Sequence, residues 1–194
     1  REENRTNKQK AHLLEANRLY NRMQLETAPQ LKKMQDLVSD LYKEDKPEKE
    51  KELLAELTLI GAYFKRRNNL LFISETQDTI RMAELGYCFQ ESVSALELQG
   101  VTGSCLVEDQ GNISLSESIQ LYDAFQSVLQ KTFSCINSIA VFLRTAESGF
   151  DMCISLHLTT EMTFQLDSDF RIEQEEENDY LLTYFVARGD GDGK

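Results

Sequence analysis

Proline is scarce in this chain, with two residues in 194, and long apolar runs are absent. So little proline, together with a hydrophobic content of 41%, argues against a disordered chain and for a packed core. No run of about 18 apolar residues occurs, which predicts that no helix of this sequence spans a membrane. The charged start, Arg1 to Arg5, has no apolar region behind it and is not a signal peptide. Such a start is typical of a helix cut in mid-course, so we expect a fragment of a longer protein.

Metal-ligand patterns are also missing. The four cysteines lie in apolar stretches without a C-x-x-C pair, and the two histidines are far apart. We therefore predict no metal site, and we interpret the cysteines as buried free thiols in a cytoplasmic protein. A nucleophile formed by Cys88 or Cys135 with His157 is a minor alternative, because His157 falls in an alternating strand pattern where a core or surface role is usual.

Charge is divided unevenly along the sequence. Residues 1–78 carry 15 basic and 14 acidic side chains, a net charge of +1, whereas residues 79–194 carry 6 and 19, a net charge of −13. A segment this acidic repels nucleic acid and anionic lipid, whose binding depends on neutralising phosphates. It is equally unsuited to ATP unless a metal and local basic groups compensate. We therefore expect no nucleic acid among the partners.

The first forty-odd residues predict one long amphipathic helix. Its apolar positions step by three and four residues with one slip, and they are Leu13, Ala16, Tyr20, Met23, Leu31, Met34, Val38 and Leu41. Pro29 sits at the slip, removes a helix hydrogen bond and crowds the preceding turn, so we predict a kink at residues 25–29. A break into two shorter helices is the alternative.

Residues 43–52 contain no apolar side chain and predict a solvated reversal, with Asp45 as cap and Pro47 in the first turn of a second helix. That helix has a similar row of positions spaced by three and four residues, which we call the seam of each helix: Leu53, Leu57, Ile60, Phe64, Arg67 and Leu71. Two such helices joined by a short turn form an antiparallel hairpin. The basic run at 65–67 lies in the last turns, where cations favour the helix dipole, so we interpret it as structural.

Each predicted helix carries more apolar surface than one partner helix covers. Two chains that form a four-helix bundle bury this surface, so we predict a homodimer. The expected dimer interface consists of seam positions on both helices: Ala16, Tyr20, Met23, Leu31, Met34, Leu57, Ile60 and Phe64.

From residue 79 the pattern changes to helices mixed with strands. It predicts a helix over 79–99 ended by Gly100, a strand over 101–108, and a helix opened by Ser114 or Ser116 that runs through Phe133. Further strands are expected at 136–144, 151–158, 170–175 and 180–187. The whole predicts an α+β protein with three parts. These are a long helical hairpin over 1–78, helices on one face of a sheet over 79–188, and a flexible tail over 189–194.

This order resembles the dimerising hairpin and the ATPase-like domain of sensor histidine kinases. Asn17–Met23 looks like the phosphoacceptor box, roughly Arg-Ile-His-Asp-x-Leu, with Tyr20 at the histidine position and Asn21 at the acidic one. Gly61–Leu70 resembles the end of the second helix in kinases of Gram-positive bacteria, and Leu121–Phe133 looks like the helix that carries the asparagine box. The resemblance implies that residues 79–188 form a small, degenerate ATPase-like sandwich of helices and sheet.

The chain departs from the family where phosphoryl transfer has its requirements. In active relatives the asparagine-box helix supplies a glutamate that helps to activate the reaction and an asparagine that holds Mg²⁺; Ser127 and Lys131 stand at the matching positions. A charged amine does not ligate Mg²⁺. No glycine lies between Gly149 and Gly189, so the loop that would cradle the phosphates is missing. We therefore expect no kinase activity and no nucleotide cofactor.

The resemblance implies an interaction or relay module in two-component signal transduction. We expect a catalytically inactive homodimer, the cytosolic part of a larger bacterial sensor, with a response regulator or another sensor protein as partner. The alternative is a phosphotransferase of the sporulation-relay type that uses His12, although His12 lacks the acidic neighbour of an acceptor. An unrelated cytoplasmic dimer with a coiled-coil arm is the third reading.

Overall fold

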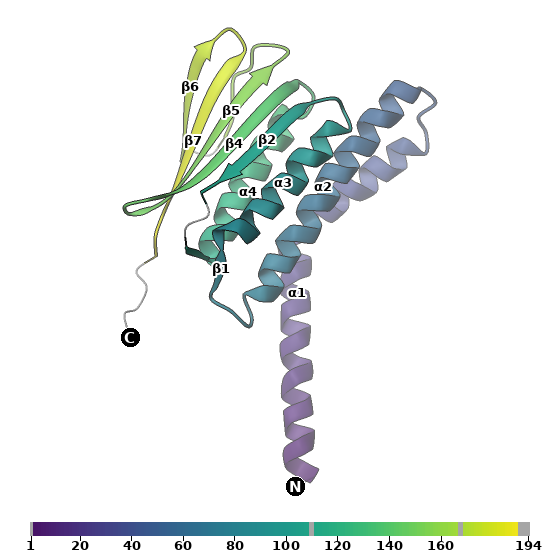
Figure 1. Cartoon of the computed structure of the whole chain (residues 1–194). Helices are drawn as coiled ribbons and strands as arrows, with labels where there is room; N and C mark the ends of the chain where they lie inside the picture. Colours follow the sequence, from purple (N-terminus) through teal and green to yellow (C-terminus); the bar gives the residue numbers. More distant parts are fainter. Residues whose placement is uncertain (1, 109–110, 167–168, 190–194) are drawn as a thin grey trace.

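A computed structural model gives the structure of residues 2–108, 111–166 and 169–189, and the side chains of residues 2–9 and 12 lie outside this description. The chain has a mixed α+β fold in which a helical hairpin precedes helices packed on a mixed sheet (Figure 1). The helices are α1 (Glu2–Leu41), α2 (Pro47–Ile73), α3 (Met82–Glu97) and α4 (Leu115–Thr132). The strands are β1 (Thr79–Arg81), β2 (Thr102–Val107), β3 (Asn112–Ser114), β4 (Ile136–Ala146), β5 (Gly149–Leu158), β6 (Phe170–Glu176) and β7 (Asp179–Ala187).

The first helix is continuous through Pro29, so the alternative of two shorter helices is wrong. Figure 1 shows that α1 changes direction between its free N-terminal part and the part beside α2, in agreement with the predicted kink. The predicted cap of α2 needs correction, because Lys46 is the N-cap and Pro47 follows it. Glu44 accepts hydrogen bonds from the N–H groups of Asp45 and Lys46 and so organises the turn. None of the described helices has the length and apolarity needed to cross a membrane.

The large sheet has the strand order β2-β4-β5-β7-β6. Strand β2 runs parallel to β4, and the other neighbouring pairs are antiparallel. A separate small sheet pairs β1 with β3. This pairing corrects the predicted helix over 79–99: Thr79–Arg81 is a strand, with Ile80 opposite Ile113, and α3 begins only at Met82.

The start of α4 confirms one of the two predicted caps. Ser114 is the N-cap, and its side chain accepts a hydrogen bond from the N–H of Glu117. The Glu117 carboxylate in turn accepts from the N–H of Ser114, which completes a capping box. The same carboxylate accepts a 2.7 Å hydrogen bond from the N–H of Gly189. The first residue of the predicted flexible tail is thus tied to α4, while residues 190–194 lie outside the described part.

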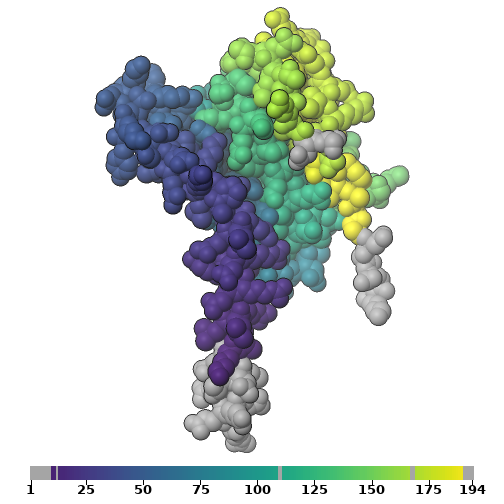
Figure 2. Space-filling view, turned by 180° about the vertical axis from the view of Figure 1, so that it is seen from behind, coloured from purple at the N-terminus to yellow at the C-terminus, as the bar shows by residue number. Residues whose placement is uncertain are grey.

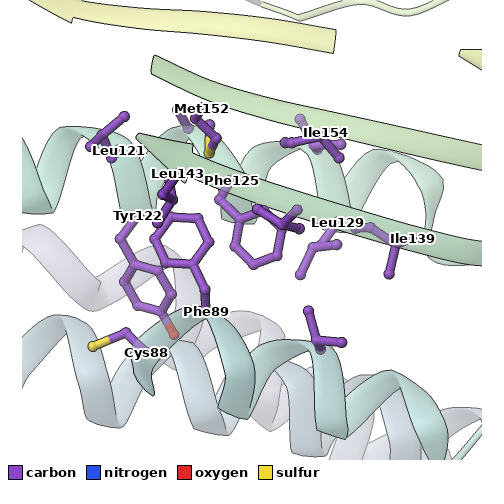
Figure 3. Close-up of a cluster of buried hydrophobic side chains, with 14 of the residues drawn as sticks. Cys88, Phe89, Leu121, Tyr122, Phe125, Leu129, Ile139, Leu143, Met152 and Ile154 are labelled. Carbon is purple, nitrogen blue, oxygen red and sulfur yellow. The ribbon is translucent and has the colours of Figure 1, made fainter. Parts of the chain in front are cut away.

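The main core lies between the sheet and helices α3 and α4 (Figure 3). Phe89 stacks on Phe125 with ring centroids 4.5 Å apart, and both side chains are fully buried. Burying one such side chain stabilises the fold by roughly 1.5–3 kcal/mol. Helix α2 contributes Leu59 and Tyr63 to this core, while Ile60 belongs to a small cluster against α1. Helix α2 therefore has one face in the hairpin and one face in the C-terminal lobe, residues 79–189.

Candidate functional site

Arg67 of α2 lies where helices α1, α2 and α4 meet. Its Nε donates hydrogen bonds to the two carboxylate oxygens of Asp123 on α4, at 2.8 and 3.1 Å. Its Nη2 donates to Glu26 Oε2 on α1 at 2.9 Å. Arg67 is 9% exposed, while the Glu26 and Asp123 side chains are 31% and 39% exposed. A single guanidinium group therefore links the first helix of the hairpin to the C-terminal lobe; we call Glu26, Tyr63, Arg67 and Asp123 the junction cluster.

Tyr63 completes the junction cluster one turn before Arg67 on α2. Its hydroxyl donates to Asp123 Oδ1 at 2.8 Å, so this carboxylate accepts hydrogen bonds from two residues of one helix. The Tyr63 ring lies 5.4 Å from the ring of Tyr122. The cluster is thus continuous with the aromatic core beneath α4.

The rest of the basic run is also used inside the chain. Lys65 Nζ lies 2.5 Å from Glu91 Oε1 on α3, and Arg66 Nε pairs with the other oxygen of the same carboxylate. The structural interpretation of residues 65–67 therefore fits these contacts. The three cations at 65–67 hold carboxylates from three different helices, α1, α3 and α4.

Burial and charge set the protonation states in the junction cluster. Burial raises the pKa of Tyr63, and the Asp123 charge raises it further, so the phenol keeps its proton and donates it. Burial by itself lowers the pKa of Arg67, but Asp123 outweighs this effect and leaves the pKa above its ordinary value. Burial raises the pKa of Asp123, although Arg67 opposes the shift. Burial has the largest single effect on the pKa of Glu26 and raises it. Hydrogen bonds and charge from Arg22 and Arg67 together outweigh burial, so the pKa lies below its ordinary value.

The junction also contains buried polar atoms without a partner among the described residues. Arg67 Nη1, Asn68 Oδ1 and both amide atoms of Gln126 are of this kind. Gln126 is only 2% exposed. Buried polar atoms without partners lower stability, so these side chains contribute less to the stability of the fold than apolar side chains of the same size would.

The positions expected from the resemblance to sensor kinases, Tyr20 and Asn21 on one side and Ser127 and Lys131 on the other, lie on the two helices that Arg67 connects. Tyr20 is 59% exposed, and its hydroxyl accepts a hydrogen bond from Gln24 Nε2; Asn21 is exposed as well. On α4, the Ser127 hydroxyl donates to the Ala124 carbonyl, and Lys131 is exposed in the last turn. Among the described residues, no hydrogen bond or ion pair joins Tyr20 or Asn21 to Ser127 or Lys131. His12 lies within α1, but its side chain is outside the description.

The apolar spacing of α2 places Arg67 on the helix seam, but the sequence pattern gives no indication of its partners Glu26 and Asp123. Glu26 lies six residues after Tyr20, about 9 Å further along α1, and Asp123 lies one turn before Ser127 on α4. The available signal was a charged residue at a seam position otherwise occupied by apolar side chains. Such a residue needs a counter-charge once it is buried.

A cavity of about 390 Å³ opens on the outer side of α4, around Ser127. Its lining consists of Ser116, Ile119, Gln120, Asp123, Ala124, Ser127 and Tyr184. Gln120 and Asp123 are already engaged, with Tyr184 and with the junction cluster. The lining includes one carboxylate and no cationic side chain, so it offers nothing to neutralise a phosphate.

The residues predicted for a dimer interface differ in how much surface they leave free. Ile60 is fully buried against α1, and Met34 and Leu57 pack on the same small cluster. Met23 and Phe64 are partly buried. The exposed ones are Ala16, Tyr20 and Leu31.

The alternative thiol nucleophiles have other partners. His157 Nδ1 lies 2.6 Å from Asp179 Oδ1, while the Cys135 thiol donates to the Thr132 carbonyl and the Cys88 thiol to the Glu84 carbonyl. Burial raises the pKa of Cys88 to about 11, so this thiol stays protonated and unreactive at neutral pH. All four cysteines are free.

Solved structures that match this chain include two histidine kinases and a phosphotransferase. Histidine kinase AdeS of Acinetobacter baumannii superposes with a TM-score of 0.39 at 6% identity, covering 85% of this chain and 98% of that one. A bacterial phosphotransferase gives 0.41 at 10% identity over 88% and 95%. Histidine kinase ThkA, solved with response regulator TrrA, gives 0.39 at 10% identity over 94% and 64%. No known family profile and no curated protein matches the sequence, and scores below 0.5 carry no residue correspondence.

Replacing Arg67 by alanine is expected to destabilise the protein by about 2–3 kcal/mol, because it leaves the Asp123 carboxylate without its counter-charge and removes one of the two cations beside Glu26. Arg67→Lys is expected to recover only part of this loss, since an amine cannot span both carboxylates. Urea unfolding measures the effect. Arg171→Ala, which removes an exposed pair with Glu173, is the matched control and should leave stability unchanged. Equal stability of Arg67→Ala and wild type would contradict the assignment.

Acid is expected to weaken the contact between α2 and α3 through Glu91. Burial by itself raises the pKa of Glu91, but hydrogen bonds from Lys65 and Arg66 outweigh it and hold the pKa below the ordinary value of 4.5. A lowered carboxylate pKa adds stability above the unfolded value, and this stability is lost as pH falls through the folded value. Melting temperatures measured from neutral pH downwards should therefore fall less steeply for Glu91→Gln than for wild type. Parallel curves would show that the pair contributes nothing.

Proposed function

We propose that this chain is a catalytically inactive, sensor-kinase-like homodimer that acts as an interaction or relay module in two-component signal transduction. The junction cluster is the observation that carries the proposal. A change in the position or rotation of α1 moves Glu26, and Arg67 passes that displacement to Asp123 and α4. The unpartnered polar atoms beside Arg67 support a contact that has more than one arrangement. The partner of such a module is a response regulator or another sensor protein.

The outer side of α4 supports the absence of nucleotide chemistry. The cavity around Ser127 presents the Asp123 carboxylate and no cation, although a bound triphosphate needs positive charge and hard oxygen ligands for Mg²⁺. Lys131 is the residue at the expected Mg²⁺-binding position, and a charged amine repels the metal. The segment from 150 to 188 contains no glycine for a phosphate loop.

The free part of α1 supports dimerisation. Helix α1 has 40 residues and α2 has 27, and Figures 1 and 2 show the N-terminal part of α1 projecting beyond the rest of the molecule. The Arg22–Glu75 pair, 3.7 Å apart, lies where α1 leaves the end of α2. Before this point Leu13 and Leu14 are 65% and 70% exposed. A lone helix with such side chains gains stability from packing against a second copy, in register along the seam.

A binding experiment tests the loss of the nucleotide site. Calorimetry with Mg-ATP is expected to show no saturable heat up to about 1 mM nucleotide, because no side chain of the cavity neutralises the phosphates. The same titration without Mg²⁺ serves as control for heat of dilution. A micromolar dissociation constant would refute the proposal that this is not an ATP-dependent kinase.

Tyr20→Lys is expected to weaken dimerisation by about tenfold or more, since it puts a charge in the seam of the free part of α1. Asn21→Lys adds the same charge one position away from the seam, so it should change the dimerisation constant by less than about twofold. Sedimentation equilibrium measures both variants. A monomeric wild type, or equal effects of the two variants, would exclude the seam as the dimer interface.

The alternative, phosphotransfer through His12, has its own test. If His12 accepts phosphate, incubation with a phosphorylated response regulator labels the chain, and His12→Ala abolishes the label. Our proposal predicts no label on either protein. His157→Ala is the control variant, because it removes the other histidine of the chain.

A further inference from the structure

The two borders of the large sheet differ in charge. At one border, β6 carries Arg171, Glu173, Glu175 and Glu176, all exposed, and its pairing with β7 shifts register near residue 175. Charges and irregularities of this kind prevent a border strand from pairing with another chain. At the other border, residues 101–107 include no charged side chain. The structure therefore leaves β2 without the protection that it gives to β6.

The hydrogen bonds of β2 show which of its backbone groups are free. Val107 pairs with Leu143, and the next N–H, that of Glu108, donates to the Leu143 carbonyl at 2.9 Å. Backbone groups of successive residues in a strand point to opposite sides, so the even-numbered residues of β2 face β4. The N–H and C=O groups of Gly103, Cys105 and Val107 consequently point away from β4. No strand among the described residues pairs with them.

This border is accessible and rigid. No residue of β2 is buried, and the Leu106 side chain is 64% exposed beside Phe142 of β4. Figure 1 shows β2 at the end of the sheet next to α3, with no strand beyond it.

Close packing connects β2 to α3. A Cβ at Gly103 would lie 2.2 Å from Val93 Cγ1, so the glycine permits direct contact between β2 and α3. A strand held in this way loses little conformational freedom when another strand pairs with it.

We propose that the free border of β2 binds an extended, basic segment of a partner polypeptide, which adds to the sheet as a further strand next to β2. Backbone groups of Gly103, Cys105 and Val107 exchange hydrogen bonds with the segment, and Leu106 packs against one of its apolar side chains. The result is a sheet of six strands with β2 in its interior.

The charge of the lobe selects the partner. Residues 79–194 carry a net charge of −13, and the exposed carboxylates of Glu97 and Glu108 flank the two ends of β2. Lysine or arginine at the ends of the added segment is therefore attracted to these carboxylates, and the net charge of the lobe favours a basic segment over an acidic one. A second copy of this chain brings the same acidic lobe and is repelled. This inference is independent of the dimerisation of α1, which uses a different surface.

Hydrogen exchange measured by NMR tests the free border directly. In the isolated protein, the amide protons of Gly103, Cys105 and Val107 are expected to exchange at least about tenfold faster than those of Ser104 and Leu106, which point towards β4. Slow exchange of all five amides would show that something in this chain already covers the border, and the proposal would be wrong.

A binding probe tests the added strand. The probe is a synthetic peptide of about eight residues in which lysine alternates with valine, with a glutamate-for-lysine peptide as its charge control. The lysine peptide is expected to bind at tens of micromolar and to slow exchange of the three outward amides about tenfold, while the glutamate peptide stays unbound. No binding of the lysine peptide up to about 1 mM would overturn the proposal.

Two changes separate strand addition from general attraction to an acidic surface. Cys105→Pro removes an outward N–H and keeps the N–H groups that face β4. A border strand tolerates proline at such an outward position, and Cys105→Ala is the control variant. Proline should weaken peptide binding about tenfold or more, and alanine should not. If the proline variant does not fold, a peptide methylated on alternate backbone nitrogens gives the same answer with the wild-type protein. Equal binding of plain and methylated peptides would refute strand addition. If Cys105→Pro instead dissociates a complex of the protein with itself, seen as slower sedimentation, a second copy occupies the border and the proposed partner is wrong.

Discussion

The guanidinium group of Arg67 has to meet carboxylates from two other helices at once, and this requirement fixes how the hairpin joins the rest of the chain. Its fork reaches Asp123 through one nitrogen and Glu26 through another. A planar group with several donors suits this position better than an amine does. The rotation of α2 about its axis is then set, which places Leu59 and Tyr63 in the main core and Ile60 against α1.

The same helix thus serves two cores, and this has a consequence for how a signal travels. In a hairpin that is only tethered to a lobe, movement of α1 is absorbed by the connection. Here α2 packs into the core of the lobe, and its contact with α4 includes an ion pair as well as apolar packing. Arg67, which makes this ion pair, also has a buried nitrogen without a partner among the described residues. Ionic contacts change partners at lower cost than packed cores change shape. The relay that we propose depends on this difference.

Acidic charge in the lobe links the two proposals about its surface. The cavity beside Ser127 presents a carboxylate where a nucleotide would bring phosphates, which supports a lobe without ATP chemistry. The same net charge of −13 favours a basic polypeptide at the uncharged border of β2. On this view the lobe has the layered form of helices on a sheet but uses the sheet, rather than a nucleotide pocket, to meet other molecules.

Sequence alone predicted what depends on neighbours in the chain. Apolar spacing predicted the hairpin, the choice of Ser114 or Ser116 as cap predicted the start of α4, and alternation predicted β4, β5 and β7 within one or two residues of their ends. Tertiary structure decided what depends on distant partners. Thr79–Arg81 is a strand because β3 pairs with it, and Arg67 finds its carboxylates 41 and 56 residues away. Local pattern cannot contain such pairs, because a short strand or a buried charge is stable only once the fold has brought its partner within reach.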